Sequence, residues 1–382
     1  MARLLAALAL LATACSAPPP ALAPPPPPAG AARYRELLHA KAGLDAGPEE
    51  LAGTARRDAA RVEARMDRLA RRIDPGAPGW RQVFARLRRD HPATDRAVLE
   101  AYRREAERAR EFVVRRGLIT VPPGPLSVIE TPSFFPPGKY PLTAYLGYKL
   151  AVTTHRGGVE RLDDHCRVCI PPLAVHETFP GHHVVFLLQH RPDPTADEAT
   201  LDRAAASFKN RFFSEGWAQY AEILMLEQGY YAGEPERELG AWREILFRID
   251  RAWIDADLHT GRLSPGRAAR ELAAAVLLDP ETAREEIDKH LREPTMKASY
   301  YVGALQILEL RAALEARVKP PARFDLRAFH DRLVRWTMPI PDVARLRFDV
   351  ELPSGLPAGG LARYLAKIPE EPSETPGRLG AP

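Results

Sequence analysis

Cysteine is scarce in this sequence, at three of 382 residues, and neither a long apolar run nor a strong charge of one sign is present. Beyond residue 14 no stretch approaches the roughly 18 apolar residues of a membrane-spanning helix. The 54 basic and 50 acidic residues interleave to a net charge of +4, which argues against a nucleic-acid partner. Strand-like alternation is rare and no internal repeat occurs, so we expect a mainly α protein.

The N-terminal residues resemble an export signal. Residues 1–14 hold one arginine and then an alanine- and leucine-rich run that ends just before Cys15. The run is too short to cross a membrane and is typical of a signal peptide. The Ala-Thr-Ala-Cys sequence resembles a bacterial lipobox, although Ala12 stands where leucine is usual. We expect a periplasmic protein or a membrane-anchored lipoprotein whose only membrane contact is a lipid on Cys15; ordinary secretion is the alternative.

Proline-rich segments divide the rest of the chain. Residues 15–31 are rich in proline and alanine and are expected to form an extended linker. Helical spacing of apolar residues dominates 32–352, which we take as one helical domain around a cleft. Within it, residues 119–141 are expected to be irregular or to form a short strand. An edge strand here could hold a substrate by strand addition. Residues 142–154 fit either a helix or a strand. Residues 353–382 form a proline- and glycine-rich tail, expected to be poorly ordered.

The most informative stretch is His-Glu-Thr-Phe-Pro-Gly-His-His at residues 176–183, which lies between two apolar runs. A histidine followed directly by glutamate is the first half of the zincin motif, in which the histidine binds Zn²⁺ and the glutamate is the general base. The second ligand normally follows four residues after the first. On a regular helix His182 would instead point about 240° away from His176, and His183 would lie about 10.5 Å along the axis.

The proline and glycine between the histidines remove this difficulty. Pro180 cannot donate a hydrogen bond to the carbonyl of His176, and Gly181 tolerates almost any backbone conformation. We therefore expect the helix to break here and to bring His182 to the position of the second ligand, with His183 as the alternative. Packing alone explains poorly why three histidines and a glutamate share one apolar segment.

A second helical run offers a third ligand. Glu215 lies in Ser-Glu-Gly-Trp-Ala-Gln-Tyr-Ala-Glu at 214–222, among aromatic residues at core spacing. Two histidines and one glutamate leave a coordination position open, which is the pattern of catalytic zinc. Glu222, two turns further on, is either an outer partner of the site or a solvated surface residue.

Together these motifs resemble the bacterial "domain of unknown function 885" family (DUF885), whose patterns are H-E-x-x-P-G-H-H and E-G-W-A-x-Y-x-E. That family is similar to the gluzincin metallopeptidases, so the resemblance implies a large, helical, zincin-like fold with Glu215 as the third zinc ligand. Residues 251–259 and 299–311 resemble two further family motifs, R-x-x-x-D-x-G-L-H and S-Y-x-x-G-x-x-x-I-L-x-L-R, with Asp257 in place of a glycine. The resemblance covers about residues 140–345.

We therefore expect a zinc-dependent metallopeptidase, with at most a small β element near its cleft. The expected zinc ligands are His176, His182 and Glu215. Glu177 is expected to take a proton from the attacking water and pass it to the leaving amine of a peptide substrate. Tyr300, or alternatively Tyr301, is expected to donate a hydrogen bond to the oxyanion. The alternatives are a zinc hydrolase acting on an ester or a cell-wall amide, and an inactive lipid-anchored binding protein.

Two nearby features call for separate expectations. Asp255 and His259, on the helix after the second motif, could orient a zinc ligand or, for His259, touch substrate. Cys166 and Cys169 form a C-x-x-C pair, for which export favours a local disulfide. A second metal site using His165 is the less favoured alternative.

Overall fold

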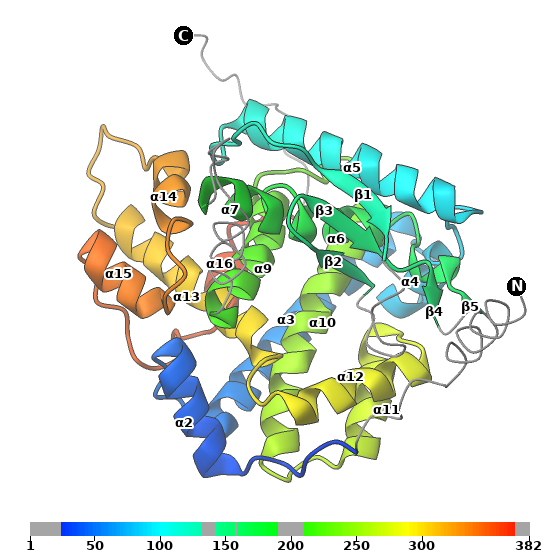
Figure 1. Cartoon of the computed structure of the whole chain (residues 1–382), viewed down its shortest axis with the longest axis horizontal. Coiled ribbons are helices and arrows are strands. Elements are labelled where there is room, and N and C mark those ends of the chain that lie inside the picture. Colours follow the sequence, from blue (N-terminus) through cyan, green and yellow to red (C-terminus); the bar gives the residue numbers. More distant parts are fainter. Residues whose placement is uncertain (1–23, 132–141, 157–158, 190–209, 371–382) are drawn as a thin grey trace, which may run out of the picture.

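The computed structural model describes residues 24–131, 142–156, 159–189 and 210–370. The expected signal peptide, Cys15, most of the linker and the last residues of the tail lie outside these ranges. The fold is mainly α, as predicted, with a small sheet on one side of the helices (Figure 1). None of the described helices has the combined length and apolar character of a bilayer span.

The N-terminal part is helical, as the spacing of its apolar residues predicts. The first helix after Asp74-Pro75-Gly76 is short, and the next begins after Thr94, whose hydroxyl accepts the N–H of Ala97 at 3.2 Å. These helices are α2 (Ala31–Ala42), α3 (Pro48–Ile73), α4 (Trp80–Leu87) and α5 (Asp95–Arg116).

Three short strands form the sheet. They are β1 (Ser127–Glu130), β2 (Thr143–Tyr145) and β3 (Lys149–Val152), in the order β1-β3-β2. β1 runs parallel to β3 and β2 antiparallel to it, which leaves β2 at an edge. The 119–141 segment thus supplies one strand, as expected, and residues 142–154 adopt the strand alternative. A second, two-stranded sheet pairs β4 (His155–Arg156) with β5 (Val159–Glu160).

Five helices build the centre of the molecule, where α10 packs along α3 and α9 along α13 (Figure 1). They are α6 (Ile170–Glu177), α7 (His182–Gln189), α9 (Arg211–Glu227), α10 (Pro235–His259) and α13 (Ala298–Glu315). A β-carbon on Gly216 would lie 2.5 Å from the Cα of Gly303. Only glycine at both positions lets α9 and α13 approach this closely, which brings Glu215 and Tyr300 to the same side of the core.

The remaining helices surround this centre. They are the 3-10 turn η1 (Leu162–Asp164), α11 (Pro265–Val276), α12 (Pro280–Arg292), α14 (Leu326–Leu333), α15 (Ile340–Phe348) and α16 (Ala362–Leu365). A disulfide joins Cys166 to Cys169 immediately before α6. It holds the chain in a tight turn at the start of the helix that carries His176.

Residues 353–370 correct an expectation. The sequence predicts a poorly ordered tail, but Leu361 and Ile368 are buried, and Arg65 of α3 donates to the carbonyl of Ile368 at 3.0 Å. The backbone N–H of Leu361 also donates to Asp58 of α3 at 2.5 Å. Apolar side chains spaced along a proline- and glycine-rich segment therefore suffice to fasten it to the domain.

Candidate metal centre

The helix that carries the first histidine ends where the second histidine begins. α6 stops at Glu177 and α7 starts at His182. A β-carbon on Gly181 would lie 1.8 Å from the carbonyl oxygen of His176, so no larger residue fits the break without a shift of the backbone. The indole N–H of Trp217 donates to the carbonyl of Pro180 at 2.9 Å, which ties the break to α9.

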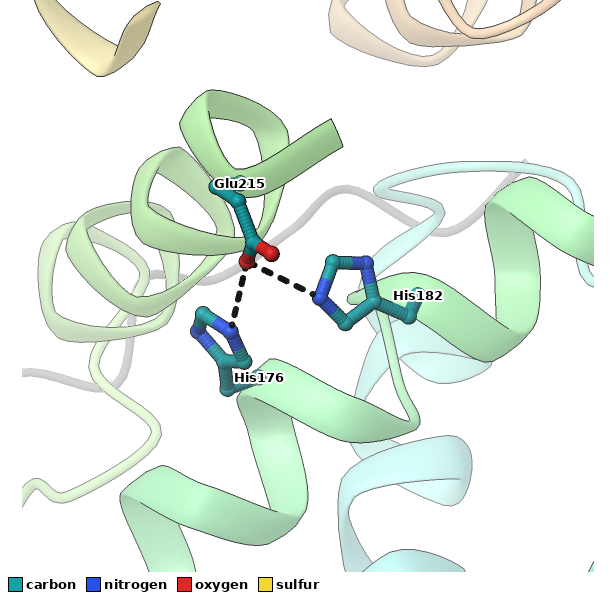
Figure 2. A group of neighbouring side chains, drawn as sticks. All are labelled: His176, His182 and Glu215. Carbon is teal, nitrogen blue, oxygen red and sulfur yellow. Dashed lines mark ion pairs between the residues drawn. The ribbon is translucent and has the colours of Figure 1, made fainter. Parts of the chain in front are cut away.

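The break brings the three predicted zinc ligands together, as Figure 2 shows. Oε2 of Glu215 lies 3.5 Å from Nε2 of His176 and 3.4 Å from Nε2 of His182. One ligand atom from each residue lies within 4.8 Å of the others. Two imidazole nitrogens and a carboxylate oxygen match the donor set of catalytic zinc sites, so the residues fit this ion.

His183, the alternative second ligand, faces a different environment. Its Nδ1 makes a 2.9 Å hydrogen bond with the hydroxyl of Tyr145, and its ring packs edge-on against Phe179. Burial lowers the pKa of His183 to about 4, so the ring is neutral at physiological pH. Of the two neighbouring histidines, only His182 belongs to the cluster.

Further charged groups hold the ligands in place. The Nδ1–H of His176 donates to Glu222 at 2.6 Å, which leaves Nε2 as the metal-binding atom. Arg248 lies 3.1 Å from the same Glu222 oxygen, and Arg211 donates to Oε1 of Glu215 at 3.0 Å. Glu222 is fully buried, so it is an outer partner of the site and not a solvated surface residue. Sequence reasoning did not find Arg248 or Arg211; the available signal was an arginine within the apolar part of α10.

The cluster favours positive charge. Burial and Arg248 lower the pKa of His176, but the carboxylates of Glu215 and Glu222 outweigh them and raise it to about 9. Burial raises the pKa of Glu215, yet the two histidines hold it well below its usual range. A divalent cation placed between these groups would meet the same carboxylates, so charge as well as donor type suits a metal ion.

The ligands line a cavity of about 980 Å³ together with both predicted catalytic residues. Glu177, next to His176 in sequence, accepts a 3.0 Å hydrogen bond from the hydroxyl of Thr143 on β2. The ring of Tyr300 stacks on His176 with 5.9 Å between the ring centres. Tyr301 instead donates to Asp58 of α3 at 2.6 Å, so of the two tyrosines only Tyr300 lines the cavity.

The other candidate residues lie elsewhere. Asp255 accepts hydrogen bonds from Tyr34 at 2.7 Å and from His290 at 2.9 Å, and His259 contacts the carbonyl of His290 at 2.9 Å. The expectation that Asp255 or His259 orients a zinc ligand is therefore wrong, since both fasten α10 to α2 and α12. His165 is buried and bonded to Thr153 and Tyr102. Both of these hydrogen bonds of His165 join parts of the fold, and neither belongs to a metal site.

Comparison with known proteins places the chain among bacterial proteins. The family model described as "Bacterial protein of unknown function (DUF885)" matches residues 1–343. A "putative lipoprotein" from Colwellia psychrerythraea has a similar structure, with TM-score 0.71 and 20% identity over 83% of this chain and 56% of that one. A "putative lipoprotein of unknown function" from Shewanella oneidensis gives TM-score 0.69 and 23% identity over 84% and 60%.

At these identities the likeness concerns the fold alone. This chain spans less than two thirds of the length of either solved structure. No curated protein matches the sequence.

Proposed function

We propose that this chain, which belongs to the bacterial DUF885 family, is a zinc-dependent metallopeptidase. The observation that carries the proposal is the meeting of His176, His182 and Glu215 on the wall of a large cavity, beside Glu177. The resemblance of the two motifs to those of gluzincin peptidases supports it.

Zn²⁺ held by the three ligands would polarise a substrate carbonyl and lower the pKa of a water molecule. Glu177 is the proton acceptor for the attacking water, because it follows a ligand directly and lies on the cavity wall. It then passes this proton to the leaving amine, which restores the carboxylate. The hydroxyl of Thr143 holds the Glu177 side chain in place during both steps.

Tyr300 is the donor to the oxyanion. Burial raises the pKa of Tyr300 well above neutral pH, so the phenol keeps the proton that it must donate. The ring is held by its stacking on His176 and by the guanidinium of Arg251, whose carbon lies 4.3 Å from the ring centre.

The edge strand favours a peptide over other acyl compounds. Residues 143–145 of β2 line the cavity, and β2 pairs with β3 but with no other described strand. Its second edge can therefore add an extended peptide through backbone hydrogen bonds, which an ester lacking amides cannot match.

Export is part of the proposal. The N-terminal signal and Cys15 support a periplasmic or lipid-anchored protein. The lipoprotein descriptions of the two solved structures are consistent with this.

Metal analysis combined with peptide hydrolysis tests the function. The purified protein should hold about one zinc per chain and cleave unmodified peptides, and a chelator should stop cleavage until zinc is returned. Glu177→Gln should keep the metal and lose activity by about 10²- to 10⁴-fold. Loss of zinc in this variant would contradict the role of Glu177 as base. Cleavage of esters or cell-wall amides without any peptide cleavage would favour the other zinc hydrolase.

A further inference from the structure

A group of cations lies in the cavity wall next to Tyr300, outside the zinc cluster, the name we give to the proposed zinc ligands His176, His182 and Glu215. Nζ of Lys297 lies 3.0 Å and Nη1 of Arg251 3.5 Å from Oε2 of Glu286, and Nζ of Lys289 lies 2.9 Å from Oε1 of the same residue. Three positive side chains thus share one carboxylate. We call Arg251, Lys289 and Lys297 the cation cluster.

Among the described residues, Glu286 is the only carboxylate that forms an ion pair with the cation cluster. Near the zinc ligands, Arg243 and Arg248 both bind Glu244, and Arg248 also binds Glu222, so two cations face two carboxylates. In the cation cluster two charges remain after Glu286 is counted. Arg251 and Lys297 are only 6% and 5% exposed, so water compensates little of this charge.

Arg251 also keeps hydrogen-bonding capacity. Its guanidinium lies between the rings of Phe247 and Tyr300, with its carbon 4.4 and 4.3 Å from the two ring centres. Among the described residues its buried Nε has no hydrogen-bond partner. Burial, together with Arg251 and Lys289, lowers the pKa of Lys297 to about 8 despite the nearby Glu286. An anionic ligand would satisfy these donors and offset the buried charge.

We propose that the cation cluster binds a carboxylate of the substrate, within about three residues of the bond that is cleaved. This rests on the proposed peptidase function. The planar fork of Arg251 matches a carboxylate. Arg251 and His176 both contact the ring of Tyr300, whose centre lies 4.3 Å from the guanidinium carbon of Arg251 and 5.9 Å from the ring centre of His176. The guanidinium carbon of Arg251 and the ring centre of His176 therefore lie no more than about 10 Å apart, and because an extended residue covers about 3.3–3.6 Å, up to three residues fill this distance.

The carboxylate has two sources in a peptide. It is either the C-terminus, which would make the enzyme an exopeptidase acting at that end, or an aspartate or glutamate side chain. Binding to the inactive Glu177→Gln protein with zinc added separates them, measured by calorimetry. Three otherwise identical tetrapeptides serve as probes: one ends in alanine with a free carboxylate, one in alanine amide and one in glutamate amide.

We expect at least one of the two acidic peptides to bind about 10- to 100-fold more tightly than the alanine amide. The peptide that does so identifies the source. Lys297→Met in the same protein should remove most of this preference, and Lys297→Arg should retain it. Arg88→Met is the matched control, because Arg88 lines the same cavity but donates to the carbonyl of Leu277 at 2.7 Å; it should keep the preference.

Equal binding of all three peptides would overturn the inference, as would a preference that survives in Lys297→Met. If Lys297→Met does not fold, the comparison of the three peptides decides alone. Hydrolysis of the same peptides by the unmodified protein separates the two proposals. A carboxylate preference without any hydrolysis would contradict the peptidase, whereas hydrolysis without a preference would contradict the carboxylate site only.

Discussion

Among the residues that the structure describes, two groups of side chains each bring three potential metal-binding atoms within 4.8 Å of one another, and the groups differ in almost everything else. The first is the zinc cluster of His176, His182 and Glu215, and the second is the group of Asp95, Glu130 and His155. The side chains of the zinc cluster are 5–11% exposed. In the second group the histidine is 39%, the aspartate 35% and the glutamate 47% exposed.

Their hydrogen bonds differ as well. In the zinc cluster Glu222 binds the far nitrogen of His176, so the near nitrogen is left for a metal ion. In the second group Nδ1 of His155 itself lies 3.2 Å from Glu130 and 3.7 Å from Asp95. Such exposed ion pairs are worth little in water. Nearness of suitable side chains is thus common to both groups, whereas burial together with outer hydrogen-bond partners is found only at the proposed zinc ligands.

Removing one histidine from each group gives the largest contrast. His182→Ala should lower zinc affinity by more than about 100-fold, since it deletes a ligand rather than an outer partner. His155→Ala should leave affinity unchanged. Equilibrium dialysis against a competing chelator measures both. Zinc loss in His155→Ala with full binding in His182→Ala would reverse the assignment of the two groups.

The helix break is the next point to test, because only the zinc cluster depends on it. Gly181→Ala places a β-carbon against the carbonyl of His176. It should lower the free energy of unfolding by about 1–3 kcal/mol and should also weaken zinc binding. Gly266→Ala in α11 meets nothing closer than 3.7 Å and is the control. Thermal unfolding and zinc titration of both variants give the answer. Undiminished zinc affinity in Gly181→Ala would show that the break does not position the ligands.

The outer partners give the smallest expected effect. Glu222→Gln keeps a hydrogen-bond acceptor for His176 but removes the negative charge, and should weaken zinc binding by about 10- to 100-fold. Glu130→Gln, the corresponding change in the second group, should leave it unaltered. The same dialysis applies. Equal effects of the two changes would mean that Glu222 does not tune the zinc ligand.

The sequence predicted that His176, His182 and Glu215 come together, because the signals for this are local. The spacing of the histidines and the Pro180-Gly181 pair together implied a break, and the structure contains it. Fold class and most helices followed from periodicity and end signals in the same way. That the three residues bind zinc stays a prediction.

Long-range features were not visible in the sequence. Arg251, Glu286 and Lys297 come from α10, α12 and the residue just before α13; only Arg251 belongs to a motif, and that motif does not indicate its partners. The hairpin between β2 and β3 was also not predictable from the sequence. Its turn uses positive φ angles of 44° at Gly147 and 59° at Tyr148, and tyrosine is an uncommon residue in that conformation.

The most direct test of the central claim is the position of zinc itself, located by anomalous X-ray diffraction from crystals of the zinc-loaded protein. The account predicts one ion bound by Nε2 of His176, Nε2 of His182 and a carboxylate oxygen of Glu215, at distances of about 2.0–2.2 Å. A zinc peak at His155 instead, or none in a protein that binds one equivalent in solution, would contradict it.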